Sequence, residues 1–288
     1  MEAFTKAFQS ACGRHHPSKV WGDFCYMAAA AFSNAVDKRN AEAREERYLQ
    51  IIRGYSPEEQ QVFPELVALM VQALEKKPFQ DFLGKHYMEL GMGNRHAGQF
   101  FTPYNVCRAM AGISIPGTVG DMIQSHGYIT IHDCACGTGA TLIAAAEVMH
   151  QRGISYQMDA LFIGQDLDYT VAMMCYIQMT LLGMAGYVRV GNTLTDPMTG
   201  SALFGPEDTD TWYTPMFFHP RWQLRRELAI LRHGLHGTDL DAPQPMTVPA
   251  PEAPRESPPP VPAEPMPVIE LADAKAHGQI QGQLAMVF

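Results

Sequence analysis

Residues 128–139 have the sequence YITIHDCACGTG, and this stretch decides the fold. It begins with a short run of β-branched and aromatic residues, which is typical of a strand. The glycines at positions 137 and 139 then permit a tight turn, and residues 140–150 are rich in helix formers. The segment therefore predicts a strand, a glycine turn and a helix in that order.

Two later segments repeat the step from strand to polar turn. Residues 160–164 (ALFIG) lead into QDLD at 165–168, and residues 187–190 (YVRV) lead into GNTL at 191–194. Between them, residues 169–182 predict a long uncharged helix. Alternating strands and helices predict a parallel sheet with right-handed crossovers, and ligands of such sheets bind at the carboxyl ends of the strands. All three turns fall at those ends.

The side chains in these turns suit an adenosine-containing cofactor. Gly137 and Gly139 let a bound group approach the backbone closely. An acid at the end of the second strand can accept bonds from both ribose hydroxyls, and Asp166 is the candidate, with Asp168 as the alternative. Asn192 offers both a donor and an acceptor to an adenine edge.

A nicotinamide dinucleotide fits this pattern less well. Its fingerprint requires a third small residue where the chain has Leu142, and an acid about twenty residues after the glycine turn. Asp166 lies 27 residues after Gly139.

Four motifs resemble those of the adenine-N6 DNA methyltransferases of the type I restriction-modification kind. The sequence DCACGTG at 133–139 looks like their cofactor motif, and GQFFTP at 98–103 looks like their second signature. GQDLD at 164–168 and GNTL at 191–194 match the next two motifs in order and approximate spacing. The resemblance covers roughly residues 85–195.

The resemblance implies a Rossmann-like α/β methyltransferase fold that binds S-adenosylmethionine. In that picture Asp133 and the glycine turn hold the methionine portion, and Thr102 with the preceding backbone closes over it. Asp166 would bind the ribose and Asn192 the adenine. The implied cofactor residues are Phe100, Phe101, Thr102, Pro103, Asp133, Ala135, Cys136, Gly137, Gly139, Asp166 and Asn192.

One motif of that family is missing. Members that methylate adenine carry Asn/Asp/Ser-Pro-Pro-aromatic, which binds the target amine and stacks on the flipped base. Partial substitutes occur as DPMT at 196–199 and DTWY at 210–213, so the candidate catalytic residues are Asp196, Pro197, Asp210 and Tyr213. The aromatic residues at 212–222 are expected instead to cover the sheet edge or to dock a partner.

Residues 1–95 predict a helical subdomain. SPEE at 56–59 is a capping box with proline at the first helical position, and apolar residues recur at helical spacing up to residue 77. Weaker helical patterns cover residues 21–36, 41–52 and 79–90. This part of the chain also contains Arg39, Arg44, Arg47 and Arg53. Two interpretations of these arginines stay open: they form a basic face for nucleic acid, or they lie on a solvated helix surface balanced by glutamates.

The end of the chain has a different composition. Between residues 243 and 267, 11 of 25 residues are proline, which disfavours helix and favours extended conformers. We therefore expect a disordered tail over residues 238–288, after a methyltransferase-like core over residues 96–237.

Composition excludes several classes of protein. With 288 residues and 47% apolar side chains the chain can bury a core, and six irregularly spaced cysteines predict neither a disulfide scaffold nor a metal site. A reducing, cytoplasmic setting is expected from these cysteines, and residues 1–13 do not have the pattern of a secretory signal. Residues 169–188 are uncharged, but their polar residues and glycines favour a buried helix and strand over a membrane span.

The favoured function is an S-adenosylmethionine-dependent DNA adenine-N6 methyltransferase, minimal or dependent on a partner. Residues 1–237 carry a net charge of −4, which neutralises few DNA phosphates, so a separate specificity subunit or another protein partner is expected. The alternative is an inactive, cofactor-binding accessory or regulatory subunit. A methyltransferase acting on RNA or protein is a third interpretation.

Overall fold

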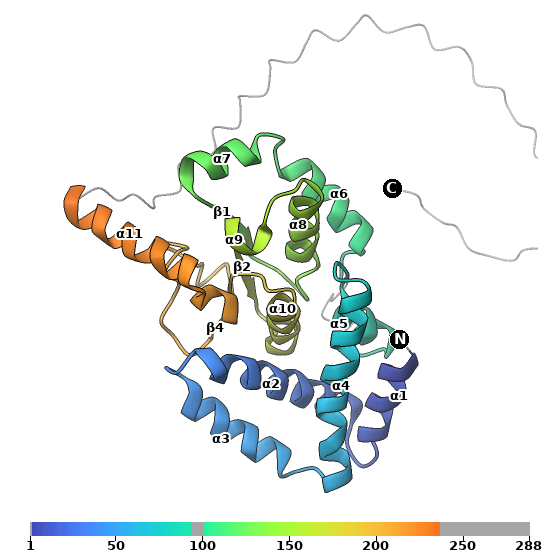
Figure 1. Cartoon of the computed structure of the whole chain (residues 1–288). Helices are drawn as coiled ribbons and strands as arrows, with labels where there is room; N and C mark the ends of the chain where they lie inside the picture. The colour runs from blue at the N-terminus through green and yellow to red at the C-terminus, as the bar shows by residue number, and fades with distance from the viewer. Residues whose placement is uncertain (1, 94–100, 237–288) are drawn as a thin grey trace, which may run out of the picture. The chain divides into compact units, whose positions relative to one another are not determined.

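The computed structural model describes residues 2–93 and 101–236. These residues belong to one compact unit, residues 1–242. The expected disordered tail at 238–288 lies outside the described residues, and so does Phe100. Figure 1 shows the arrangement of the elements within the compact unit.

The first part of the described chain is helical, as the sequence predicts. The capping box is present, because Ser56 Oγ accepts from Glu59 N (3.3 Å) while Glu59 Oε2 accepts from Ser56 N (2.7 Å). No strand is found among residues 2–93. The helices are α1 (Glu2–Ala11), α2 (Pro17–Val36), α3 (Ala41–Ile52), α4 (Pro57–Lys76) and α5 (Phe82–Glu89).

The second part alternates between helices and strands. Its elements are α6 (Tyr104–Ser114), α7 (Val119–His126), β1 (Ile129–Asp133), α8 (Ala140–Gln151), α9 (Tyr156–Asp159), β2 (Ala160–Asp166), α10 (Tyr169–Leu181), β3 (Gly186–Val190), β4 (Thr211–Tyr213), the 3-10 helix η2 (Pro215–Phe218) and α11 (Pro220–His236). The three predicted strands pair in parallel in the order β1-β2-β3. The chain is therefore an α/β protein with a mostly parallel sheet.

A fourth strand, which the sequence reasoning did not predict, closes one edge of the sheet. β4 pairs antiparallel with β3, with Tyr213 opposite Tyr187 and Thr211 opposite Arg189. The aromatic cluster after residue 211 thus covers the sheet edge, as expected from its composition. Among the described residues, β1 pairs only with β2, so its other edge has no strand beside it.

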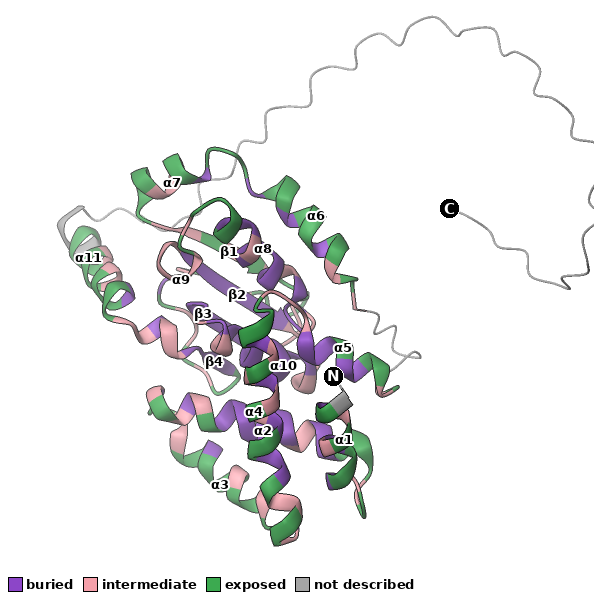
Figure 2. Ribbon diagram, turned by 45° about the vertical axis from the view of Figure 1, so that its right-hand side comes forward, coloured by how far each residue is buried: buried purple, intermediate pink, exposed green. Residues whose placement is uncertain are grey.

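The helices that connect the parallel strands lie on the same face of the sheet, because the strand order advances in one direction through two crossovers of the same hand. α8 and α10 pack there against Phe162 and Val188 in the larger core. On the opposite face, Leu161 and Tyr187 form a smaller core with Trp222 from α11. Figure 2 shows the buried strands between these two layers.

The N-terminal helices share the larger core with the sheet. α2 packs directly on α10, and the indole Nε1 of Trp21 donates to Met174 Sδ (3.2 Å) across that contact. This packing buries both sides of α10, which explains why its sequence is uncharged. Within the described ranges, no helix has both the length and the apolar character to cross a membrane.

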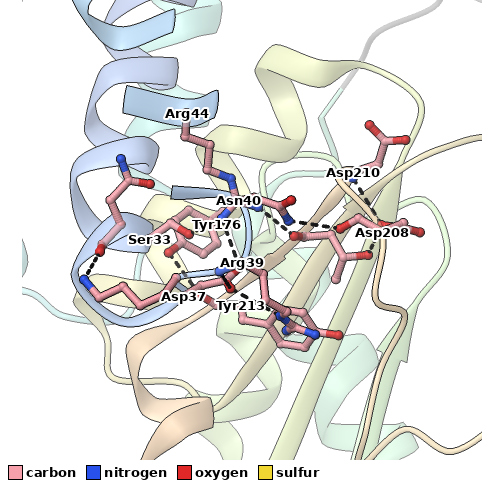
Figure 3. A network of polar contacts seen from close by, with 12 residues as sticks. Ser33, Asp37, Arg39, Asn40, Arg44, Tyr176, Asp208, Asp210 and Tyr213 are labelled. Carbon is pink, nitrogen blue, oxygen red and sulfur yellow. Dashed lines mark hydrogen bonds and ion pairs between the residues drawn. The ribbon is translucent and has the colours of Figure 1, made fainter. Parts of the chain in front are cut away.

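One of the four arginines, Arg44 of α3, does not lie on a surface. Arg44 is buried, and its guanidinium donates to Asp37 Oδ2 (3.0 Å) and to the carbonyl of Thr211 (3.0 Å) while it lies over the Trp212 ring. Figure 3 shows this network, in which Arg39 lies against Tyr213. Both interpretations of these arginines as a surface are therefore wrong for Arg44, which ties the α2–α3 corner to β4.

Candidate functional site

Three turns follow the parallel strands: residues 133–139 (first turn), 165–168 (second turn) and 191–194 (third turn). Hydrogen bonds join them into one polar surface at the carboxyl edge of the sheet. Gly137 N in the first turn donates to Asp166 Oδ2 (2.8 Å), and Gly191 N in the third donates to the carbonyl of Asp166 (2.9 Å). Thr193 Oγ1 donates to the carbonyl of Cys134 in the first turn (2.6 Å). The structure thus brings together the turns that the sequence predicts to meet.

In the first turn, the acid is held by its own loop and helix. Asp133 Oδ1 accepts from Ala135 N (3.0 Å), and Asp133 Oδ2 accepts from Thr141 Oγ1 in the first turn of α8. Gly139 is the N-cap of α8, and the first amides after a cap have no partner within their helix. A carboxylate and a set of helix amides therefore adjoin at this point, and the amides suit a negatively charged group.

The two glycines of the first turn have different roles. Both have a positive φ, +54° at Gly137 and +89° at Gly139, which other residues rarely adopt. A Cβ on Gly139 would lie 2.7 Å from Cys175 Sγ on α10, so this glycine is required by packing beneath the turn. A Cβ on Gly137 would point toward Phe101 at 3.7 Å instead. Of the two, only Gly137 adjoins the upstream loop.

Cys136 is a buried residue that packs beneath the first turn. Its side chain is buried, and a Cβ on Gly164 of β2 would lie 3.0 Å from its Sγ. Its contact with Cys175 and its burial raise the pKa of the thiol well above the usual value, so it stays protonated. Among the residues that the structure describes, no group of three or more His, Cys, Asp or Glu side chains is arranged to hold a metal ion.

In the second turn, the two acids differ in what holds them. Asp168 is the N-cap of α10, where its Oδ1 accepts from Val171 N (3.1 Å). Asp166 accepts one backbone amide on each oxygen, from Gly137 on Oδ2 and from Asp168 on Oδ1 (2.9 Å). Each carboxylate oxygen can accept more than one bond, so Asp166 keeps capacity for two hydroxyl donors in a fixed orientation. Asp166 is thus fixed by the first turn as well as by its own turn.

In the third turn, Asn192 has an oriented side chain. Its Oδ1 accepts from Leu194 N (3.0 Å), which closes a turn of the kind that Asn favours. Its carbonyl accepts from Asp196 N (2.8 Å). The amide nitrogen of Asn192 thus has a defined direction as a donor.

The upstream loop meets the first turn. Phe101 is half-buried, lies next to Gly137, and its ring contacts the ring of Tyr87 on α5 with centroids 5.9 Å apart. Thr102 is exposed, and Pro103 is the N-cap of α6. Residues 101 and 137 are thereby adjacent in space, as the resemblance implies.

A buried hydrogen-bond cluster that the sequence reasoning missed fixes α5 to the first turn. Asp81 is the N-cap of α5, and its carboxylate also accepts from Thr138 Oγ1 (2.6 Å). Gln178, fully buried on α10, donates to Asp81 Oδ1 (3.0 Å) and to the carbonyl of Thr138 (2.9 Å), and accepts from Leu83 N (3.0 Å). The sequence did contain one sign of this cluster, because Gln178 is a single amide side chain within an apolar helix.

The candidate catalytic residues lie in different places. Asp196 and Pro197 are exposed beyond the third turn, where Asp196 Oδ2 pairs with Arg189 Nη2 (2.7 Å). Asp210 is exposed, and its carbonyl accepts from Val190 N (3.0 Å), which places it at the carboxyl end of β3. In Figure 3 its carboxylate points away from Asp208.

Tyr213 is not at that edge. Because β4 is antiparallel, the chain runs from Asp210 toward the amino end of β3, where Tyr213 is buried. Its hydroxyl donates to the carbonyl of Pro206 (2.5 Å), and its ring packs on Tyr187 and Phe217. The structure therefore separates the two ends of the DTWY segment, and the buried Tyr213 ring has no free face for a base.

The sequence reasoning also missed Thr214-Pro215-Met216-Phe217, which has proline and an aromatic residue at the second and fourth positions of the missing tetrapeptide. Thr214 is buried, and its Oγ1 donates to the carbonyl of Met184 (2.8 Å) and accepts from Gly186 N (3.1 Å). Phe217 is buried in the smaller core. In this conformation the segment serves packing at the amino end of β3.

Residues 81–223 match the family model described as N-6 DNA Methylase. This part of the chain belongs to the N-6 DNA methylase family. The methylase match begins at Asp81 and ends in α11, so it extends beyond the expected residues 85–195 and includes the Asp81–Gln178 cluster.

One solved structure that resembles the chain is the methyltransferase subunit of a type I restriction-modification system from Streptococcus thermophilus. The match has 20% sequence identity and a TM-score of 0.37, and covers 63% of this chain. It spans 41% of that subunit, less than half of its length. No curated protein matches the chain.

Proposed function

We propose that the chain is an S-adenosylmethionine-dependent DNA adenine-N6 methyltransferase that needs a partner to complete its site. The observation that carries the proposal is the joined set of turns at the carboxyl edge, which presents Asp133, Asp166 and Asn192 beside the helix amides of α8. Membership of residues 81–223 in the N-6 DNA methylase family supports the same reaction class.

The proposed roles follow from the hydrogen-bond donors and acceptors that each group can still provide to a ligand. Asp133 and the α8 amides would hold the amino acid portion, because they provide an acceptor for an ammonium and donors for a carboxylate. Asp166 would accept from the ribose hydroxyls, and the Asn192 amide would donate to the adenine. Phe101 would exclude water on the upstream side. When bound, S-adenosylmethionine supplies a methyl group activated by a sulfonium.

The amine to be methylated needs acceptors that point at its hydrogens. Asp196 and Asp210 are the proposed candidates, because both are exposed and both lie near the carboxyl edge. Asp196 is neutralised by Arg189, so Asp210 is the stronger of the two. Pro197 and Tyr213 offer no acceptor side chain facing this edge.

The second candidate function is a cofactor-binding accessory subunit without transfer activity. The antiparallel course of β4 favours it, because this course carries Tyr213 and Thr214 away from the turns. Among the described residues β1 has a strand on one side only. This favours the second candidate as well, since a strand from another protein could complete the site there. In both candidates the chain binds S-adenosylmethionine, and DNA recognition rests with a partner.

A methyl-transfer assay separates the two candidates. The intact chain is incubated with methyl-labelled S-adenosylmethionine and DNA, with and without extract from its source as a supply of partners. Label on adenine, reduced at least tenfold by Asp210→Ala with unchanged cofactor affinity, is the expected result. Cofactor binding without any label on DNA would overturn the enzyme and favour the accessory subunit.

A further inference from the structure

Among the described side chains of helix α11, those of one side fix the helix to the sheet. Trp222 is fully buried, and its Nε1 donates to the carbonyl of Gln157 (3.0 Å). Arg225 donates to the carbonyls of Met158 and Gly127, and Arg226 Nη2 donates to the carbonyl of Phe217 (2.9 Å). Figure 1 shows that the helix then projects away from the sheet.

The opposite side of α11 carries an exposed leucine stripe, which we define as Leu224, Leu228 and Leu231. These three residues are 54%, 42% and 60% exposed. Large apolar side chains this exposed, repeating on one helix, mark an interaction surface. Figure 2 shows the exposed outer side of the helix.

The spacing of the stripe indicates a helical partner. The leucines are four and then three residues apart, and Leu235 continues this spacing in the sequence. This is the alternation of a coiled-coil seam. Arg232 flanks the seam on one side and Glu227 on the other, so the apolar strip is narrower than the face that a helix buries in a membrane surface or a domain core.

We propose that the leucine stripe of α11 pairs with the same stripe of a second copy, as a parallel two-stranded coiled coil. With Leu224 and Leu231 at the d positions and Leu228 at the a position, Glu227 falls at g and Arg232 at the following e. In a parallel pair, g of one helix faces the following e of the other. Glu227 of each copy then lies beside Arg232 of its partner, on both sides of the symmetric seam.

Charge selects this orientation over the antiparallel one. An antiparallel pair sets g against g and e against e, which would place two Glu227 side chains together and two Arg232 side chains together. Of the residues that anchor the helix, Trp222, Arg226 and Ala229 occupy b and f positions on the outside of the seam, and Arg225 occupies the e position after Leu224. The anchored helix is already ordered, so pairing needs no helix nucleation.

The test is the mass of the intact chain by sedimentation equilibrium, from about 1 to about 200 μM, where a short seam should show a concentration-dependent dimer. Leu231→Lys should weaken the dimer at least tenfold. Ile230→Lys is the matched control, because Ile230 is equally exposed (60%) but lies off the seam at position c. It should leave the association unchanged.

A charge exchange tests the orientation. Glu227→Arg alone should weaken the dimer by at least threefold, because it sets arginine against Arg232 of the partner, and Arg232→Glu alone should do the same. The double variant Glu227→Arg/Arg232→Glu should recover the association of the unmodified chain. A monomer at every concentration, a dimer indifferent to Leu231→Lys, or a double variant no stronger than the single ones would each overturn the proposal.

Discussion

At the residue scale, Gly139 joins the functional turn to the core. Its φ of +89° and the 2.7 Å approach of a Cβ to Cys175 Sγ both oppose any side chain. Gly153, in the loop after α8, has a similar φ of +73° but has no atom within 4 Å of such a Cβ. A comparison of substitutions at Gly139 and Gly153 therefore distinguishes the cost of backbone strain from the cost of crowding.

We expect Gly153→Ala to lower the free energy of unfolding by about 1 kcal/mol through backbone strain alone. Gly139→Ala should lower it by about 3 kcal/mol, since crowding against Cys175 is added. Urea denaturation of both variants measures the difference. Equal losses in the two variants would mean that α10 does not press on the turn.

His86 shows how burial makes stability depend on pH. It is 1% exposed against the rings of Phe4 and Phe82, and burial lowers the pKa of its imidazole from 6.5 to about 4. The folded protein keeps His86 neutral where the unfolded chain protonates it. Its contribution to stability is therefore complete above pH 6.5 and is lost as the pH falls toward 4.

The free energy of unfolding should consequently fall by on the order of 2 kcal/mol more between pH 7 and pH 4.5 in the unmodified chain than in His86→Gln. Denaturation at the two pH values measures this difference. His126→Gln is the control, because His126 is exposed on α7. If His86→Gln kept the full pH dependence, another group would be responsible.

At the scale of elements, one side chain of α10 joins α5 to the first turn. Gln178 satisfies Asp81, Leu83 N and the carbonyl of Thr138 at once. Gln178→Leu should lower the free energy of unfolding by about 2–4 kcal/mol, because these buried groups lose their hydrogen-bond partner. Met173→Leu on the same helix should cost about 1 kcal/mol or less, since it keeps volume and breaks no hydrogen bond. Thermal denaturation of both variants measures the losses in free energy of unfolding. If the loss with Gln178→Leu were no larger than with Met173→Leu, Gln178 would not have this role.

The elements also show what the sequence could predict. β1, β2 and β3 are apolar runs that end in polar turns, and the predicted and observed bounds differ by one or two residues. β4 is only three residues long, too short to show an alternation, and it is fixed by Arg44 from 167 residues away. The direction of β4, and with it the location of Tyr213, depends on such long-range contacts and could not be predicted.

The same reasoning applies to the site. Asp133, Asp166 and Asn192 could be found because each lies at the end of a strand or just after it, and the carboxyl ends of parallel strands share one edge. Asp81 and Gln178 are 97 residues apart, and nothing local marks them as partners.

At the scale of the whole molecule, the folded unit and the proline-rich end are expected to be independent. Prolines make up 11 of the 25 residues from 243 to 267, which opposes regular packing. A chain that ends at Ala242 should melt within roughly 2 °C of the intact chain in scanning calorimetry. A decrease of more than roughly 5 °C would mean that these residues belong to the fold.

The measurement closest to the central claim is titration calorimetry of the intact chain with S-adenosylmethionine and its demethylated product. The joined turns predict binding of both compounds, and affinity at least tenfold weaker in Asp166→Asn, because the variant loses the charge that orients the ribose hydroxyls. Asp121→Asn, an exposed acid on α7, should bind as the unmodified chain does. A chain without affinity for either compound would contradict the account.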